Sequence, residues 1–104
     1  MAGKIESYLG FCLRARKIVL GSGSIEMQKK GVYLIIVCST ASENTFKVAQ
    51  KFKNRFSCPL MVCNVGLENA VHREGCKVAA IKDYELAQAI IANANDDYLL
   101  YIGG

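Results

Sequence analysis

The sequence is poor in several features that would each point to a particular class of protein. It contains one histidine and one proline, and no apolar stretch approaches the roughly 20 residues that a membrane-spanning helix needs. We therefore expect no contact with a membrane. Disorder is excluded as well, because 52% of the residues are hydrophobic and can bury enough surface to offset the ordering entropy. At 104 residues, we expect a single domain spanning 1–104.

The cysteines form neither a paired set nor a metal-binding pattern. The five are Cys12, Cys38, Cys58, Cys63 and Cys76. Their odd number, and the lack of a signal-peptide pattern, favour a cytoplasmic protein with reduced thiols that pack as small hydrophobes. The spacings from Cys58 to Cys63 and from His72 to Cys76 fit zinc motifs poorly. We therefore expect no metal ion and no cofactor.

A catalytic set is also missing from the sequence. A nucleophilic Cys–His pair would need a partner for His72, and only Cys76 is close to it in the chain. Glu68 and Glu74 could form a carboxylate pair, although charged residues beside a short helix usually face solvent. The sequence therefore predicts no catalytic residues and a protein that is not an enzyme. An enzyme that holds an anionic substrate on residues 21–24 is one alternative.

The charge is unevenly distributed along the chain, although the formal net charge is only +4. Residues 1–82 contain all thirteen Lys and Arg but five of the nine acids, whereas residues 83–104 contain four acids and no base. A basic body favours polyanions such as nucleic acid, and an ordinary solvated surface is the alternative. Charge alone does not decide between the two.

The first half of the chain predicts two helices and a buried strand. Apolar residues recur at helical spacing over residues 5–13. A break at residues 20–24 precedes a second helix, which Ser24 caps and which stops at Gly31. Residues 32–38 form a continuous, largely β-branched run, typical of a strand that is buried on both faces of a sheet.

The second half repeats the alternation of helix and strand. Ser42 is expected to cap a helix that ends near Phe56, and Asp83 to cap the last helix. The other expected elements are strands at 60–63 and 78–81 and a short helix at 67–72. Helices that alternate with short apolar strands predict an α/β fold, here a three-layer α/β/α sandwich with a small mixed sheet.

Two loops offer exposed backbone to a ligand. The first, at a predicted helix start, consists of Gly21, Ser22, Gly23 and Ser24. Free N–H groups there can bind an anion or an RNA sugar-phosphate, but Glu26 at the third glycine position and the absence of a predicted preceding strand exclude a dinucleotide fingerprint. The second loop, before a predicted strand, consists of Glu74, Gly75, Cys76, Lys77 and Val78. RNA-binding proteins often contact bases with such loops, and a plain connection is the alternative for each.

Taken in order, these segments resemble the L7Ae/L30e superfamily of ribosomal proteins, and more closely its small bacterial L7Ae-like members. The resemblance covers about residues 8–90. The matching pieces are LGFCLRARK at 9–17, GSGS at 21–24, LIIV at 34–37, ASENT at 41–45, PLMV at 59–62, LENA at 67–70 and VAAIKD at 78–83. Their common order and spacing carry the resemblance.

The resemblance implies an L30e-like sandwich and a non-enzymatic, ribosome-associated RNA-binding protein. Members commonly bind kink-turn RNA through the glycine-containing start of the second helix, supported by the loop before the last strand. In this chain those places are residues 21–24 and 74–78. We expect the positive potential to come from Arg14, Arg16, Lys17, Lys29, Lys30 and Lys77.

The chain departs from the family pattern at the first of these places. Gly23 and Ser24 stand where typical members carry Asn or Lys and Glu or Gln, and Met27 stands near the usual lysine. Shorter side chains there predict contacts to RNA backbone in place of base recognition. A protein-interaction module with an eroded RNA site is the alternative. In that case the apolar segment 98–102 would add to a partner or a second copy, unless it packs on its own domain.

Overall fold

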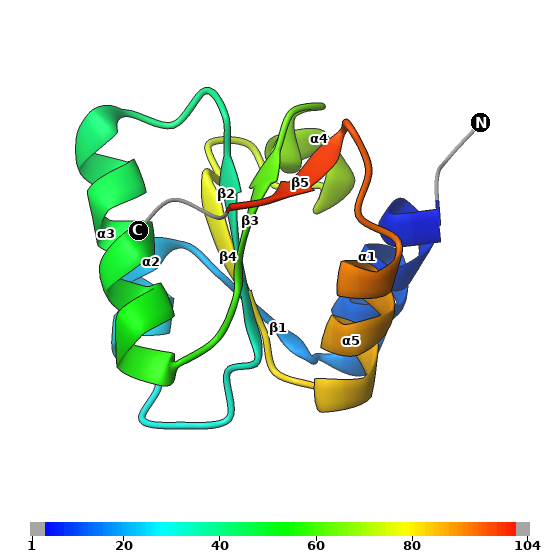
Figure 1. The fold of residues 1–104 in the computed structure, drawn as a ribbon, viewed down its shortest axis with the longest axis horizontal. Coiled ribbons are helices and arrows are strands. Elements are labelled where there is room, and N and C mark those ends of the chain that lie inside the picture. The colour runs from blue at the N-terminus through cyan, green and yellow to red at the C-terminus, as the bar shows by residue number, and fades with distance from the viewer. Residues whose placement is uncertain (1–3, 102–104) are drawn as a thin grey trace.

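The computed structural model describes residues 4–101 as alternating helices and strands (Figure 1). In chain order the elements are α1 (Lys4–Ala15), β1 (Ile18–Leu20), α2 (Ser22–Glu26), β2 (Leu34–Cys38), α3 (Glu43–Phe56), β3 (Leu60–Cys63), α4 (Leu67–Ala70), β4 (Val78–Ile81), α5 (Tyr84–Ala92) and β5 (Tyr98–Leu100). Within the described residues, no helix is both long enough and apolar enough to cross a membrane. The predicted alternation is confirmed, and β1 and β5 extend it.

The strands form one mixed sheet in the order β1-β4-β2-β3-β5. β2 and β3 run parallel, whereas β4 is antiparallel to both β1 and β2, and β5 is antiparallel to β3. At the centre, Ile36 of β2 lies between Met61 of β3 and Ala79 of β4. The carboxyl end of β2 is therefore at the same edge of the sheet as the amino end of β4.

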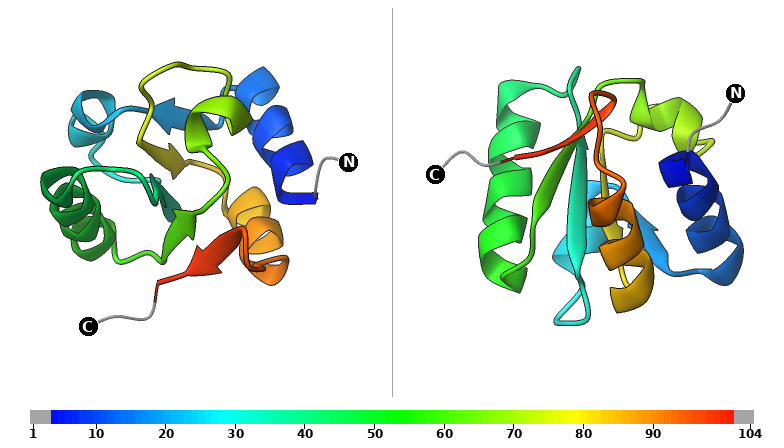
Figure 2. Two further views of the ribbon diagram at one scale, coloured as in Figure 1. Left: turned by 90° about the horizontal axis from the view of Figure 1, so that it is seen from above. Right: turned by 45° about the vertical axis from the view of Figure 1, so that its right-hand side comes forward.

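Helices cover both faces of this sheet (Figure 2). α1 and α5 lie on one face, and α2 and α3 lie on the other. Every residue of β2 is buried, with Leu34 and Ile36 in the core beneath α1 and α5, and Ile35 and Val37 in the core beneath α3. This central position explains the uninterrupted apolar run of β2, because side chains on both of its faces are covered. The predicted α/β/α sandwich is confirmed.

The helix caps predicted at two positions are also confirmed. At the start of α3, the Oγ of Ser42 accepts a hydrogen bond from the N–H of Thr45 at 3.1 Å. At the start of α5, Oδ1 of Asp83 accepts one from the N–H of Leu86 at 2.9 Å. These oxygens satisfy backbone donors that a helix start otherwise leaves free. Local sequence therefore sets where both helices begin.

The prediction for residues 18–31 is wrong in two respects. Residues 18–20 form strand β1, which three residues are too few to indicate by periodicity. α2 starts directly after Gly21 and is complete in five residues, whereas the sequence predicts Ser24 as the cap and a helix that stops at Gly31. The physical reason is the pairing of β1 with β4, which fixes where the chain leaves the sheet.

Smaller differences occur at other boundaries. β2 begins at Leu34 rather than at residue 32, and α4 ends at Ala70 rather than at His72. The apolar segment near the carboxyl terminus forms β5, which pairs with β3, and its Tyr98 is 2% exposed. Residues 98–100 therefore pack on their own domain, while Ile102 lies outside the described residues.

Candidate nucleic-acid interface

The two predicted loops meet where β1 ends and β4 begins. Gly21 follows β1 directly, and its N–H donates a hydrogen bond of 3.0 Å to the carbonyl oxygen of Val78. This bond continues the antiparallel pairing of β1 with β4. Residues 21–24 and 74–78, which are far apart in the chain, therefore lie side by side. Cys76 and Val78, which the sequence predicts to contact RNA, are buried in the core, so the surface is formed by residues 21–24 with Glu74, Gly75 and Lys77. We refer to this surface as the glycine end.

The fold requires two of the three glycines of the glycine end. Gly21 and Gly75 have φ angles of 88° and 80°, which L side chains rarely adopt, so the backbone itself requires glycine. Gly23 has no positive φ, and a Cβ added to it would meet no atom within 4 Å. Glycine in a helix costs roughly 0.5–1 kcal/mol relative to alanine. The fold therefore does not require glycine at position 23, where the backbone is exposed without a side chain.

The first N–H groups of α2 belong to exposed residues and have no partner within the helix. Ser22, Gly23 and Ser24 are exposed, whereas Ile25 is fully buried and anchors the helix in the core. The first bond within the helix runs from the N–H of Ile25 to the oxygen of Gly21 at 3.1 Å, so the preceding donors have no helical partner. No described side chain caps them. They are available to oxygen atoms of an approaching molecule.

Glu68 of α4 holds the loop at 74–78 in shape. Its Oε2 accepts a bond from the N–H of Gly75 at 2.8 Å, and its Oε1 pairs with the Nζ of Lys77 at 2.5 Å. The bonds from Lys77 and Gly75 hold the pKa of the Glu68 carboxyl below its ordinary value, and Glu68 raises the pKa of Lys77. Glu68 thus pairs with Lys77 rather than with Glu74, and the predicted positive potential of Lys77 is balanced locally.

Thr40 connects this loop to a buried thiol. Its Oγ1 accepts a bond from the Nζ of Lys77 at 3.0 Å and lies 3.1 Å from the Sγ of Cys38. Burial acts to raise the pKa of Cys38, but hydrogen bonds from Thr40 and the backbone, with the charge of Lys77, lower it overall. Elsewhere, burial raises the pKa of Cys12 and of Cys58 to about 11. All five cysteines are free and buried, as predicted.

Arg73 is an exposed cation beside the glycine end that the sequence prediction missed. Its carbonyl oxygen accepts a bond from the N–H of Cys76 at 3.3 Å, so it begins the turn that leads into the loop. His72 beside it is exposed, with a φ of 55°. The available signal was the run His-Arg-Glu-Gly at 72–75, which places two basic residues next to the predicted loop. Residues 4–101 hold no cluster of three His, Cys, Asp or Glu suited to a metal.

Four of the other five predicted cations belong to segments at the opposite ends of β1 and β2. The fifth, Arg14, lies in the last turn of α1. Arg16 and Lys17 precede β1 and so stand at the end of that strand away from the glycine end. Lys29 and Lys30 precede β2, whose carboxyl end lies beside the glycine end. β1 and β2, with three and five residues, span roughly 10 and 16 Å. The structure therefore brings the two loops together and leaves these four cations apart from them.

The glycine segment is preceded by a strand, contrary to the prediction. β1 is a three-residue strand at the edge of the sheet. Glu26 still occupies the third glycine position of the dinucleotide fingerprint. The fingerprint is therefore absent, although one of the two reasons given for excluding it is wrong.

Comparison with known proteins gives a fold but no function. No family model and no curated protein matches this chain. A solved structure from Bacillus halodurans, described as a protein with unknown function, matches with 25% sequence identity and a TM-score of 0.71. The match covers 88% of this chain and 96% of that chain. The α/β fold is thus shared over most of both chains.

Proposed function

We propose that this protein binds RNA without catalysing a reaction, and that RNA backbone lies against the glycine end. The observation that carries the proposal is the bond from the N–H of Gly21 to the carbonyl oxygen of Val78, which holds residues 21–24 beside residues 74–78. These are the two places that the resemblance to L7Ae-like proteins assigns to RNA. The protein would then act in association with the ribosome or another RNA assembly.

The chemistry of the glycine end supports contacts to sugar and phosphate. Proteins commonly hold the nucleic-acid backbone with main-chain N–H groups, and residues 22–24 are exposed with N–H groups that have no helical partner. The bare backbone of Gly23 permits close approach of another chain. Arg73 supplies an exposed positive charge beside the loop, while Lys77 and Glu68 keep the loop in place.

Recognition in this proposal depends on the shape of the RNA rather than on its bases. The side chains of Gly23 and Ser24 are too short to reach far into a groove. Met27, near the usual lysine of the family, is 80% exposed and brings no charge. A kink-turn or a similar bend would be held through its sugar-phosphate backbone at the glycine end.

A binding titration with a kink-turn RNA and a straight duplex of equal length tests the proposal. Tighter binding of the kinked RNA supports it. Equal affinity for both would remove the preference for a bend, and no binding to either at low salt would contradict RNA binding altogether. Each phosphate contact steepens the log–log salt dependence by about 0.9 on duplex DNA and by less on single strands. The few unpaired cations of the glycine end predict a shallow slope.

A protein-interaction module on the same fold is the second candidate. β5 is an edge strand, and its Leu99 is 46% exposed. An edge strand carries unpaired backbone groups that can add to another sheet. Light scattering of the full chain and of a Leu99→Lys variant tests self-association, because a charge on an edge strand opposes such pairing. A monomeric mass for both would remove this form of the idea.

A further inference from the structure

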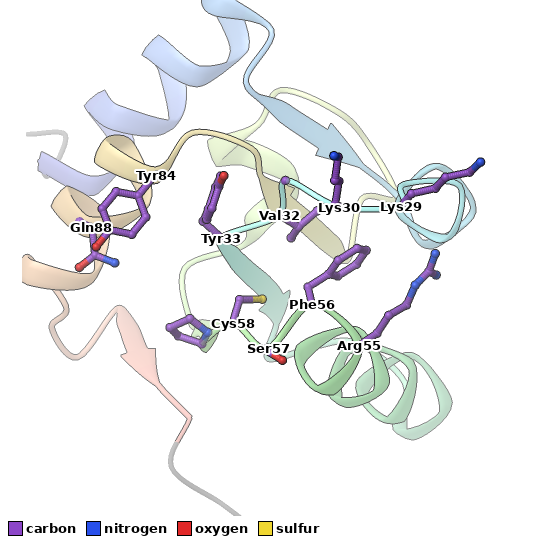
Figure 3. Close-up of a pocket in the computed structure, with 12 residues that line it drawn as sticks. Lys29, Lys30, Val32, Tyr33, Arg55, Phe56, Ser57, Cys58, Tyr84 and Gln88 are labelled. Atoms are coloured by element: carbon purple, nitrogen blue, oxygen red, sulfur yellow. The ribbon is translucent and has the colours of Figure 1, made fainter.

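A hollow of about 430 Å³ lies at the end of the central strands that is opposite the glycine end (Figure 3). It lies between the loop at 29–33, the turn at 55–59 and the first turns of α5. These segments meet because β2 and β3 are parallel, so the chain enters both strands at the same edge. The volume is within the usual range for small-molecule sites. We refer to this cavity as the basic hollow.

Exposed aromatic rings border the basic hollow. Tyr33 and Tyr84 are 39% and 59% exposed, and they meet edge to face with their centroids 5.6 Å apart. In Figure 3, Tyr33 stands between Tyr84 of α5 and Phe56 at the end of α3. Rings that remain open to solvent beside a cavity offer faces on which a planar group can stack.

Two unpaired lysines give the basic hollow its charge. Lys29 and Lys30 are exposed, and neither forms an ion pair or side-chain hydrogen bond within residues 4–101. No Asp or Glu lines the cavity. Arg55 is different, because its Nη atoms donate to the backbone oxygens of Glu26 and Gln28 at 3.0 and 2.6 Å, and the Glu26 carboxylate lies 3.9 Å away. Arg55 therefore fixes the wall, and the lysines remain free for an anion.

We propose that the basic hollow binds a nucleoside phosphate, either as a free nucleotide or as an unpaired nucleotide of an RNA strand. The base stacks on the ring of Tyr84 and meets the ring of Tyr33 edge to face, because the two rings are nearly perpendicular, and the phosphate lies near Lys29 and Lys30. The amide of Gln88, which both donates and accepts hydrogen bonds, faces the edge of the base. A ligand with both a planar ring and a negative charge uses all of these groups together. The proposal does not depend on RNA binding at the glycine end.

NMR titration of the full chain, following backbone amides, tests this proposal. The probes are the four ribonucleoside 5′-monophosphates taken singly, inorganic phosphate, O-phosphotyrosine and single-stranded RNA hexamers. We expect chemical-shift changes concentrated at residues 29–33, 55–59 and 84–88. At least one nucleotide should bind about tenfold more tightly than inorganic phosphate, because stacking of one base on an aromatic ring contributes roughly that much affinity. No such shifts with any nucleotide or hexamer would overturn the proposal. So would phosphate or O-phosphotyrosine binding as tightly as every nucleotide.

The two sources of the ligand differ in affinity. A hexamer that binds much more tightly than its mononucleotide identifies unpaired RNA as the occupant, because neighbouring nucleotides add contacts. Similar affinities identify a free nucleotide. Both outcomes support the shared chemistry of ring and phosphate.

Matched variants separate binding from folding. Tyr84→Ala and Lys30→Ala should each weaken nucleotide binding by about tenfold, since each removes one stacking or charge contact. Phe11→Ala and Lys51→Ala remove an exposed ring and an exposed lysine that do not line the basic hollow, and both should bind as the unaltered chain does. Unchanged melting temperatures would show that all four fold. Equal affinities across the four would contradict the proposal.

Discussion

The glycine end and the basic hollow lie at opposite ends of the strands of one sheet, and they expose different chemical groups. The glycine end exposes backbone, and its loop cation Lys77 is paired with Glu68. The basic hollow exposes side chains, namely unpaired lysines beside the rings of Tyr33 and Tyr84. Backbone donors suit a sugar-phosphate chain, whereas rings suit a single planar group. The difference teaches that charge counted along a sequence does not locate a site, because most of the cations predicted for the first edge lie at the second.

The largest effect is expected from truncating the core side chain that anchors α2 beneath the glycine end. Ile25→Ala should lower the free energy of unfolding by about 2–5 kcal/mol, because the side chain is fully buried and its loss leaves a cavity. Urea denaturation measures the change. Met27→Ala, two residues later and 80% exposed, should stay within about 0.5 kcal/mol of the unaltered chain. Equal effects of the two variants would show that α2 is not anchored by Ile25.

Alanine substitutions at two neighbouring glycines test what the backbone of the glycine end requires. Gly21→Ala should destabilise the fold by about 1–3 kcal/mol, because alanine is strained at a φ of 88°. Gly23→Ala should instead raise the free energy of unfolding by roughly 0.5–1 kcal/mol, since alanine favours helix and meets no neighbour. Thermal unfolding measures both changes.

The same Gly23→Ala variant separates stability from binding. If RNA backbone approaches residue 23 closely, the added methyl group should weaken RNA binding roughly three- to tenfold, about the loss of one hydrogen bond. A more stable protein that binds RNA less tightly is therefore expected. RNA affinity equal to that of the unaltered chain would contradict the contact at Gly23.

Arg55 tests whether the two edges are independent. Arg55→Ala should lower the free energy of unfolding by about 1 kcal/mol, because the partly exposed Arg55 side chain no longer donates hydrogen bonds to two carbonyl oxygens. It should also weaken nucleotide binding at the basic hollow and leave RNA binding at the glycine end unchanged. Lys51→Ala on the outer side of α3 is the control for lost charge. An equal loss of both kinds of binding would show that the edges are coupled.

The smallest expected effect concerns the ion pair that holds the loop of the glycine end. The pKa of Glu68 is lowered from its ordinary value of 4.5. The contribution of the pair to stability is therefore fully present above pH 4.5 and is lost as the pH falls through the lower pKa of the folded state. The amide resonance of Gly75, which bonds to Glu68, should titrate in this acid range.

Two variants check this assignment. Glu68→Gln should abolish the acid titration of the Gly75 amide, because the titrating partner is gone. Glu74→Gln should preserve it, since Glu74 makes no hydrogen bond or ion pair within residues 4–101. Loss of the titration in both variants would assign it to another group.

Much of the fold could be predicted because local patterns record burial directly. The apolar run of β2 reflects a strand covered on both faces, and Ser42 and Asp83 cap their helices through bonds to residues three positions later. β1 and α2 could not be predicted in the same way. Three residues carry too little periodicity, and the start of α2 depends on pairing with the distant strand β4.

The loops of the candidate site were predictable in part, because glycine requirements are also local. Both loops of the glycine end stood out by their glycines, and the positive φ angles of Gly21 and Gly75 are a local demand of the backbone. The pairing of Glu68 with Lys77 across the loop, and the exposure of Arg73, depend on how α4 and β4 are placed.

The sequence by itself determined the helices and strands other than β1 and α2, which thiols and apolar residues enter the core, and which loops need glycine. Each of these follows from interactions within a few residues or from a residue's own solvation. Only the tertiary structure decided which loops share an edge of the sheet. Strand order and direction place Gly21 against Val78, and they place Lys29 and Lys30 beside Tyr33 and Tyr84. Those neighbours come from pairing and packing between distant segments, which no local pattern contains.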